Sequence, residues 1–258
     1  MIIGAHRSGT SATAHALRML GLQLGHILDS HDEPRPLQKF HEKLLRDLGG
    51  AWFNPRPAIA AVSDPEGKIR VFRQLLEMVY ARFAETFGYR KTPRGIYRLS
   101  MLKRGAVWGW KEPRTTLLAP AWLEMFPEAH IIHIVRHPLR VGRSIQAREM
   151  NFRAGGDAPN PALDDLTDCV RVAISYTEAG AALESIARNY LRVRFEDLQT
   201  GPRQTLERMA EFAGLEADRT TLDSAAGTIT SDRTDGLTIN ASVAPLLDNA
   251  LLRELGYT

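Results

Sequence analysis

The chain has 258 residues, of which 44% are hydrophobic, with a single cysteine and a formal charge of +3. This length suits one large domain with a buried core and is too short for two substantial ones. A lone cysteine excludes a disulfide-bonded scaffold, and no apolar run approaches the roughly 18 to 20 residues that a membrane span needs. Because no signal-peptide pattern precedes the first motif, we expect a cytosolic protein without a membrane span.

The first half of the chain predicts short strands among several helices. An apolar run ending in glycine predicts a buried strand over residues 1–4, and a Gly- and Ser-rich turn then leads into a helix over 11–21. Further helices are expected over 34–48 and 67–87, and three prolines predict a loop between these two. A strand is expected over 107–110.

The second half predicts a regular alternation of helices and strands. The expected elements are helices over 117–126, 138–150, a stretch within 163–189 and 202–214, strands over 130–135 and 190–195, and an irregular loop over 151–162. Strands that alternate with helices predict a three-layer α/β domain with a mostly parallel central sheet. In such domains, ligands bind beyond the carboxyl ends of the strands.

Two segments far apart in the sequence carry basic residues and no carboxylate. One spans residues 1–28 and the other spans 129–148, where four arginines accompany three histidines. Each segment places basic residues directly after a predicted strand, so folding would bring them to one edge of the sheet. The pattern predicts an anion-binding site there.

The segment from Gly4 to Ser11 is typical of a phosphate-binding loop between a strand and a helix. Backbone N–H groups and the start of a helix attract phosphate or sulfate at such a turn. The segment resembles the loop G-x-x-x-x-G-K-[ST], but Thr10 replaces the lysine and the cation is Arg7. Losing that lysine argues against ATP or GTP hydrolysis. The alternative interpretation of the same residues is a simple Gly-Ser turn that starts a helix, with a solvated arginine.

Arg136 and Ser144 follow the predicted strand over 130–135. A guanidinium at a strand end and a hydroxyl on the next helix can hold one terminal phosphate, the first as a bidentate charged donor. The alternative is an arginine at the surface and a serine that only fills a helix.

Four blocks together resemble the sulfotransferase superfamily, whose members use 3′-phosphoadenosine 5′-phosphosulfate (PAPS) as sulfuryl donor. In chain order they are the loop Gly4 to Ser11, the W-K-E-P-R segment from Trp110, the R-H-P element from Arg136 to Ser144, and V-R-F-E-D-L from Val193. They run from residue 4 to about 215. The resemblance implies a P-loop-like nucleotide-binding fold and a single sulfotransferase domain over residues 1–258.

The resemblance also implies the donor site and the catalytic cations. PAPS would be the donor and adenosine 3′,5′-bisphosphate (PAP) the product, with no metal required. Arg7 and Lys111 would stabilise the transferring and leaving groups; the alternative for Lys111 is an ion pair with Glu112 or Glu124. The donor contacts implied are His6, Arg7, Ser8, Gly9, Thr10, Ser11, Arg136, Ser144 and Arg233 of the C-terminal segment.

A general base must take the acceptor's proton. Family members of this type carry a glutamate ahead of a leucine-rich helix that ends in L-G-G, and counting back from Gly50 places it at Glu33. An acid in a polar loop fits Glu33 equally well. His41 and Glu42 are alternative bases, although a position on the helix surface is expected for each.

The acceptor is left open by the sequence: a hydroxyl or amine of a carbohydrate, another small molecule or a peptide. Insertions over 30–105 and 150–165 would build its pocket. The sequence also leaves open whether the chain forms a homodimer. Rival hypotheses are a P-loop kinase and a non-catalytic module that binds polyanions or nucleic acid. Because no aromatic residue lies between 129 and 149 for base stacking, we expect no nucleic-acid partner.

Overall fold

The structure is a computed structural model that describes residues 1–25, 27–87, 89–91, 97–99, 106–155, 160–230 and 238–257. Its centre is a parallel three-stranded sheet in the order β1 (Ile2–Gly4), β4 (His130–Val135) and β5 (Asn189–Arg194). After its first residue, β4 is buried throughout. A continuous apolar run of this kind is typical of a strand covered on both faces.

The expected strand over 107–110 is present only as isolated bridges. Trp108 bridges Gln23, and Lys111 bridges Ile2. The amide of Ile2 donates to the carbonyl of Trp110 at 3.0 Å. This segment therefore runs beside β1 and brings Lys111 next to the loop that follows β1.

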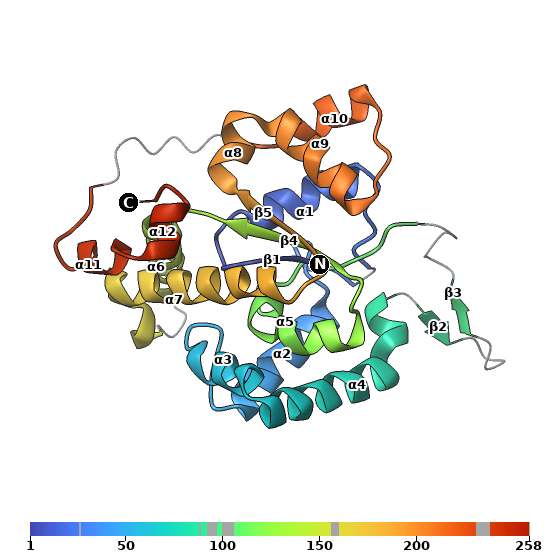
Figure 1. Ribbon diagram of the computed structural model, residues 1–258, viewed down its shortest axis with the longest axis horizontal. Coiled ribbons are helices and arrows are strands. Elements are labelled where there is room, and N and C mark those ends of the chain that lie inside the picture. The colour runs from blue at the N-terminus through green and yellow to red at the C-terminus, as the bar shows by residue number, and fades with distance from the viewer. Residues whose placement is uncertain are drawn as a thin grey trace.

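Helices cover both faces of the sheet (Figure 1). One layer holds α1 (Thr10–Met19), α9 (Pro202–Ala213) and α10 (Arg219–Ala226), and the other holds α5 (Thr115–Met125) and α7 (Leu166–Ala181), with α6 (Pro138–Ala154) beside α7. The prediction of a three-layer α/β domain around a mostly parallel sheet is confirmed. The sheet is small, and most of the mass is helical.

A helical group packs on the outer side of α5 (Figure 1). It comprises α2 (Arg35–Asp47), α3 (Arg56–Ser63) and α4 (Pro65–Phe87), and the hairpin of β2 (Tyr89–Lys91) and β3 (Tyr97–Leu99) follows α4. The prediction of a loop between the second and third predicted helices is wrong, because α3 lies there. Pro57 and Pro65 stand in the first turns of α3 and α4, where a helix needs no backbone N–H.

The C-terminal part adds short helices that the sequence did not predict. They are α8 (Phe195–Thr200), α10, α11 (Ala244–Leu247) and α12 (Ala250–Glu254); single 3-10 turns occur at Pro161–Leu163 and Ala182–Ser185. Apolar residues of the segment 243–257 pack against α6 and α7. Helix α6 also runs four residues into the loop expected over 151–162, and the helix expected within 163–189 ends at Ala181.

Two further findings concern the interior. Cys169 is fully buried, and burial raises the pKa of its thiol to about 11, as expected for an unreactive core residue. No helix in the described ranges is long and apolar enough to cross a membrane.

Candidate active site

The loop between β1 and α1 lies at the carboxyl edge of the sheet. Two residues in it have positive φ angles, Arg7 at 69° and Gly9 at 99°. Gly9 is the N-cap residue of α1, and no side chain caps this helix. The first backbone N–H groups of α1 therefore point out of the helix toward any anion that approaches the loop.

Two glycines let the loop sit tightly on its neighbours. A Cβ atom at Gly4 would lie 2.4 Å from the carbonyl oxygen of Ile134 in β4. A Cβ atom at Gly9 would lie 2.1 Å from the ring of Phe195. The loop therefore has the close approach to β4 and to the end of β5 that only glycine permits.

Ser8 and His6, two of the expected donor contacts, have partners within the protein. Both the amide and the hydroxyl of Ser8 donate to the carbonyl of Ala5, so Ser8 braces the loop. The ring of His6 packs edge-on against Trp52, with ring centroids 4.8 Å apart. Burial, and then Arg114, holds the pKa of His6 well below its usual range, so this ring adds no positive charge to the loop.

The two segments without carboxylates, residues 1–28 and 129–148, meet at Arg7. Its Nε donates to Ser144 Oγ at 3.0 Å, and Arg136 Nη1 donates to the Arg7 carbonyl at 3.0 Å. The Arg136 guanidinium also stacks over the Phe195 ring, 5.1 Å from its centroid. Burial, and then the charge of Arg148, lowers the pKa of Arg7. Guanidinium groups that repel each other at one place favour an anion between them.

Lys111 and Glu33 form a buried ion pair beside this cluster. Lys111 Nζ lies 2.8 Å from Glu33 Oε1 and donates to Ser11 Oγ at 3.1 Å. The lysine thus joins the glutamate to the first turn of α1. Burial raises the pKa of Glu33 to about 7 even though Lys111 pulls it down. A carboxylate with such a pKa can accept a proton near neutral pH.

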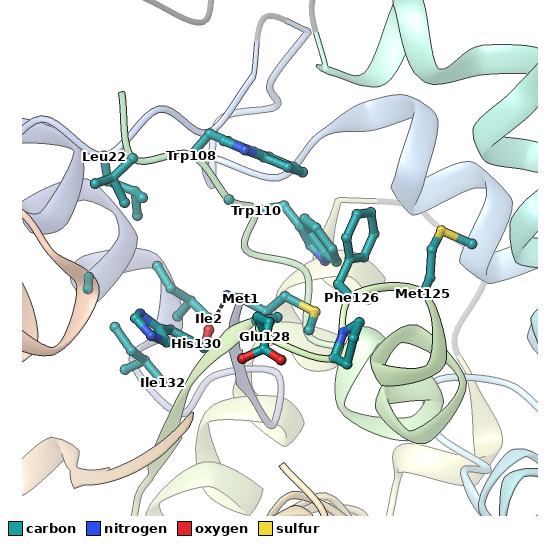
Figure 2. A pocket seen from close by; sticks show the side chains of 15 residues that line it. Met1, Ile2, Leu22, Trp108, Trp110, Met125, Phe126, Glu128, His130 and Ile132 are labelled. Atoms are coloured by element: carbon teal, nitrogen blue, oxygen red, sulfur yellow. Dashed lines mark hydrogen bonds between the residues drawn. The ribbon is translucent and has the colours of Figure 1, made fainter. Parts of the chain in front are cut away.

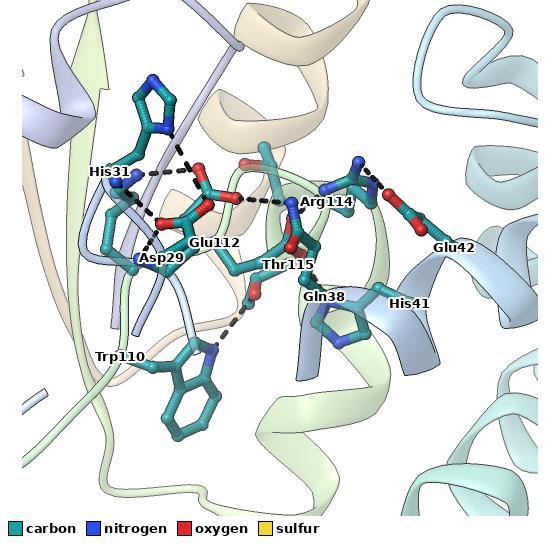
Figure 3. Close-up of polar contacts among 12 residues, drawn as sticks. Asp29, His31, Gln38, His41, Glu42, Trp110, Glu112, Arg114 and Thr115 are labelled. Carbon is teal, nitrogen blue, oxygen red and sulfur yellow. Dashed lines mark hydrogen bonds and ion pairs between the residues drawn. The ribbon is translucent and has the colours of Figure 1, made fainter. Parts of the chain in front are cut away.

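An aspartate that the sequence analysis missed holds Glu33 in place. The amides of His31 and Glu33 both donate to Asp29 Oδ1, at 2.8 and 2.9 Å (Figure 3). Gln38 Nε2 lies 3.5 Å from the other carboxylate oxygen of Glu33. The sequence could have indicated this role, because Asp29 stands shortly before a predicted helix. An aspartate in such a place commonly accepts hydrogen bonds from backbone amides two or more residues further along the chain.

Glu112 turns away from Lys111 and is the centre of a second polar group. Its carboxylate accepts from His41 Nδ1 and from Arg114, and Arg114 also binds Glu42 (Figure 3). Burial favours a raised pKa for Glu112, but Arg114 and the hydrogen bond from His41 outweigh it and leave that pKa lowered to about 2. The alternative pairing of Lys111 with Glu112 or Glu124 is therefore wrong, since Lys111 binds Glu33.

His41 is buried, not at the helix surface as expected. Its Nδ1 binds Glu112, and its Nε2 accepts from Trp122 Nε1 at 3.1 Å. Both ring nitrogens are thus engaged in the interior. Glu42 is partly exposed and paired with Arg114. Of the three candidate bases, Glu33 is the one in contact with the phosphate-loop residues, through Lys111.

Among the described residues, the hollows away from the loop include an apolar cavity and a groove. An apolar cavity of about 420 Å³ opens at the amino ends of β1 and β4, lined by Trp108, Trp110 and Phe126 among others (Figure 2). A groove of about 640 Å³ lies between the start of α3 and α7 and is lined by Phe53, Arg56 and Ala162 among others. The groove draws on both predicted acceptor insertions, parts of which fall outside the described residues. Arg233 also lies outside them.

Among the described residues, no three His, Cys, Asp or Glu side chains gather in a way that could hold a metal ion.

Comparison with solved structures shows the same fold in a bacterial enzyme. STF9, a sulfotransferase from Mycobacterium avium, aligns with a TM-score of 0.52 and 16% identity over 94% of this chain and 70% of that one. Sulfotransferase domains of the Synechococcus PCC 7002 olefin synthase and of the curacin biosynthetic pathway align at 18% and 15% identity. Their TM-scores are 0.48 and 0.49, over 98% and 100% of this chain and 81% and 96% of theirs.

No curated protein matches the chain in sequence. A family model described as Sulfotransferase family matches residues 1–219, which include the phosphate loop, Lys111, Arg136 and Ser144. With this match over most of its length, the chain belongs to the sulfotransferase family.

Proposed function

We propose that this protein transfers the sulfuryl group of PAPS to a hydroxyl or amine of a carbohydrate, another small molecule or a peptide. The observation that carries the proposal is the meeting of Arg7, Arg136 and Ser144 beside the uncapped start of α1. A nucleotide with anionic groups at both its 5′ and its 3′ positions suits cations and N–H donors that come from two such segments.

The donor set fits PAPS better than ATP. The N–H groups at the start of α1, Arg7 and the Ser11 hydroxyl would hold the 5′-phosphosulfate. Arg136 and Ser144 would hold the 3′-phosphate, which ATP lacks. In a nucleoside triphosphatase, a lysine stands where this chain has Thr10, and that lysine binds the β- and γ-phosphates of ATP. This chain lacks that contact.

The reaction needs placement and charge stabilisation more than covalent help from the protein. The acceptor atom forms a bond to sulfur while the bond between sulfur and the 5′-phosphate oxygen breaks. Glu33 takes the acceptor's proton, and PAP departs with the bonding electrons. Arg7 and Lys111 offset the negative charge that builds on the leaving phosphate. The 2.8 Å contact of Lys111 with Glu33 supports a site in which base and cation work side by side.

Isothermal titration calorimetry separates this proposal from its rivals. The proposal expects PAP to bind more tightly than ATP with Mg²⁺, and more tightly than adenosine 5′-monophosphate (AMP), which lacks the 3′-phosphate. A kinase would prefer ATP with Mg²⁺. A polyanion-binding module would be indifferent to the 3′-phosphate and would lose affinity steeply with salt for any nucleic acid. Either of these results would overturn the proposal. A screen of acceptor classes with donor carrying radiolabelled sulfate then identifies the acceptor.

A further inference from the structure

The C-terminal segment reaches the same corner of the sheet as Arg136. Tyr257, three residues beyond α12, is buried, and its ring lies 5.3 Å from that of His137. The Arg194 guanidinium at the end of β5 stacks over the Tyr257 ring at 5.0 Å. In Figure 1, α12 lies beside α6, the helix that starts directly after His137.

Glu196 links Tyr257 to the backbone next to Arg136. Its Oε1 accepts from the amide of His137 at 3.0 Å, and its Oε2 accepts from the Tyr257 hydroxyl at 2.7 Å. Each carboxylate oxygen thus has a partner that is not Arg136. Burial and the charge of Glu196 raise the pKa of Tyr257, so the phenol stays protonated and keeps donating.

Arg136 lies close to this carboxylate, because its guanidinium stacks over the ring of Phe195, the residue before Glu196, and Glu196 binds the amide of His137, the residue after Arg136. Burial lowers the pKa of Arg136, and Glu196 is the largest influence that opposes burial. A carboxylate oxygen that loses its hydrogen-bond donor beside a guanidinium tends to accept a hydrogen bond from that guanidinium instead. Such a hydrogen bond would compete directly with a phosphate for the same N–H donors.

We propose that Tyr257 is a positioning residue for nucleotide binding, because its hydroxyl engages Glu196 Oε2 and keeps the carboxylate from pairing with Arg136. The ligand group concerned is the 3′-phosphate of the nucleotide. This inference rests on the proposed function, since it takes Arg136 as the ligand of that phosphate. It assigns a binding role to the C-terminal segment, about 120 residues from Arg136 along the chain.

Tyr257→Phe tests the inference through the difference between two nucleotides. Calorimetry should show PAP affinity lowered roughly three- to tenfold, because the freed carboxylate oxygen competes with the 3′-phosphate for Arg136 with about the strength of one ordinary hydrogen bond, and AMP affinity should be unchanged. In turnover assays the KM for PAPS should rise while kcat at saturating donor stays the same. Tyr190→Phe is the matched control, because Tyr190 lies on β5 and its hydroxyl binds His133 of β4, away from Glu196. It should leave the affinity for both nucleotides unchanged.

A second variant supplies an independent outcome. Glu196→Gln removes the competing charge and keeps an oxygen for the amide of His137, so PAP affinity should rise about two- to threefold. In the Tyr257→Phe background, Glu196→Gln should restore PAP affinity to at least the wild-type value.

Two results would overturn the inference and leave the proposed function intact: equal losses for PAP and AMP in Tyr257→Phe, or a loss for PAP that Glu196→Gln does not restore. A wild-type protein that binds PAP no better than AMP would instead overturn the proposed function.

Discussion

The ion pair of Lys111 with Glu33 gives the proposed reaction a defined pH dependence. Because Glu33 accepts a proton only as the carboxylate, the rate should rise with pH through its pKa of about 7. In Glu33→Gln this rise should be absent and turnover much lower. Stopped assays of kcat/KM between pH 5.5 and 9 test this. A Glu33→Gln variant with the wild-type profile would assign the base to another residue.

Removing the partner charge should shift the same profile. Lys111→Ala leaves Glu33 buried without its cation, so the pKa of Glu33 rises further and the acidic limb of the profile moves to higher pH. Turnover should also fall by about 10² to 10³, as when a preorganised charge stabiliser is lost. Lys68→Ala is the matched control, because Lys68 pairs with Glu124 at the surface. An unmoved limb in Lys111→Ala would show that the pair does not tune Glu33.

Tyr176 presents a buried hydroxyl with no hydrogen-bond partner among the described residues. Its ring faces His6 at a centroid distance of 6.0 Å, and burial raises the pKa of the phenol, which stays neutral. Removing an unsatisfied polar group should cost nothing, so Tyr176→Phe should leave the free energy of unfolding unchanged or raise it by up to about 1 kcal/mol. Tyr190→Phe should lower it by about 1 kcal/mol, because that hydroxyl is bonded to His133. Urea denaturation measures both, and a loss above 1 kcal/mol in Tyr176→Phe would contradict the prediction.

Among the elements, α1 carries a matched pair of glycines at its two ends. Gly9 and Gly21 have nearly equal φ angles of 99° and 103°, but a Cβ atom at Gly9 would strike the Phe195 ring, whereas one at Gly21 would meet nothing within 4 Å. Gly21→Ala should therefore cost only backbone strain, roughly 1 kcal/mol. Gly9→Ala adds overpacking and should cost about 3 kcal/mol in all.

Urea denaturation of the two variants checks this difference, and a double-mutant cycle with Phe195→Ala isolates its cause. The cost of Gly9→Ala should shrink toward that of Gly21→Ala once the ring is absent. Equal costs in the wild-type background would mean that Phe195 yields to the added methyl group.

Local patterns were sufficient to predict the elements that frame the proposed donor site. The apolar run over 130–135 and the glycines within residues 4–9 determine the backbone conformation locally. The strands, the loop and the helix that contain them could therefore be predicted from the sequence. Helix α3 was missed because prolines that start a helix and prolines that break one look alike in sequence. His41 was placed at the surface because its partners, Glu112 and Trp122, lie more than 70 residues away.

At the scale of the whole molecule, the proposed donor site joins segments that begin at β1 and end beyond β5. A ligand that binds the folded protein alone stabilises it by about 2.7 kcal/mol at a concentration of 100 times Kd. For a domain of this size that corresponds to a rise in Tm of roughly 5 to 11 °C. Differential scanning fluorimetry with PAP should show this rise, and AMP at the same concentration should give a smaller one. In Arg136→Ala the two shifts should converge, because Arg136 is the residue proposed to hold the 3′-phosphate that AMP lacks. Equal shifts for PAP and AMP in the wild-type protein would mean that β1, α6 and β5 do not meet around a 3′-phosphate.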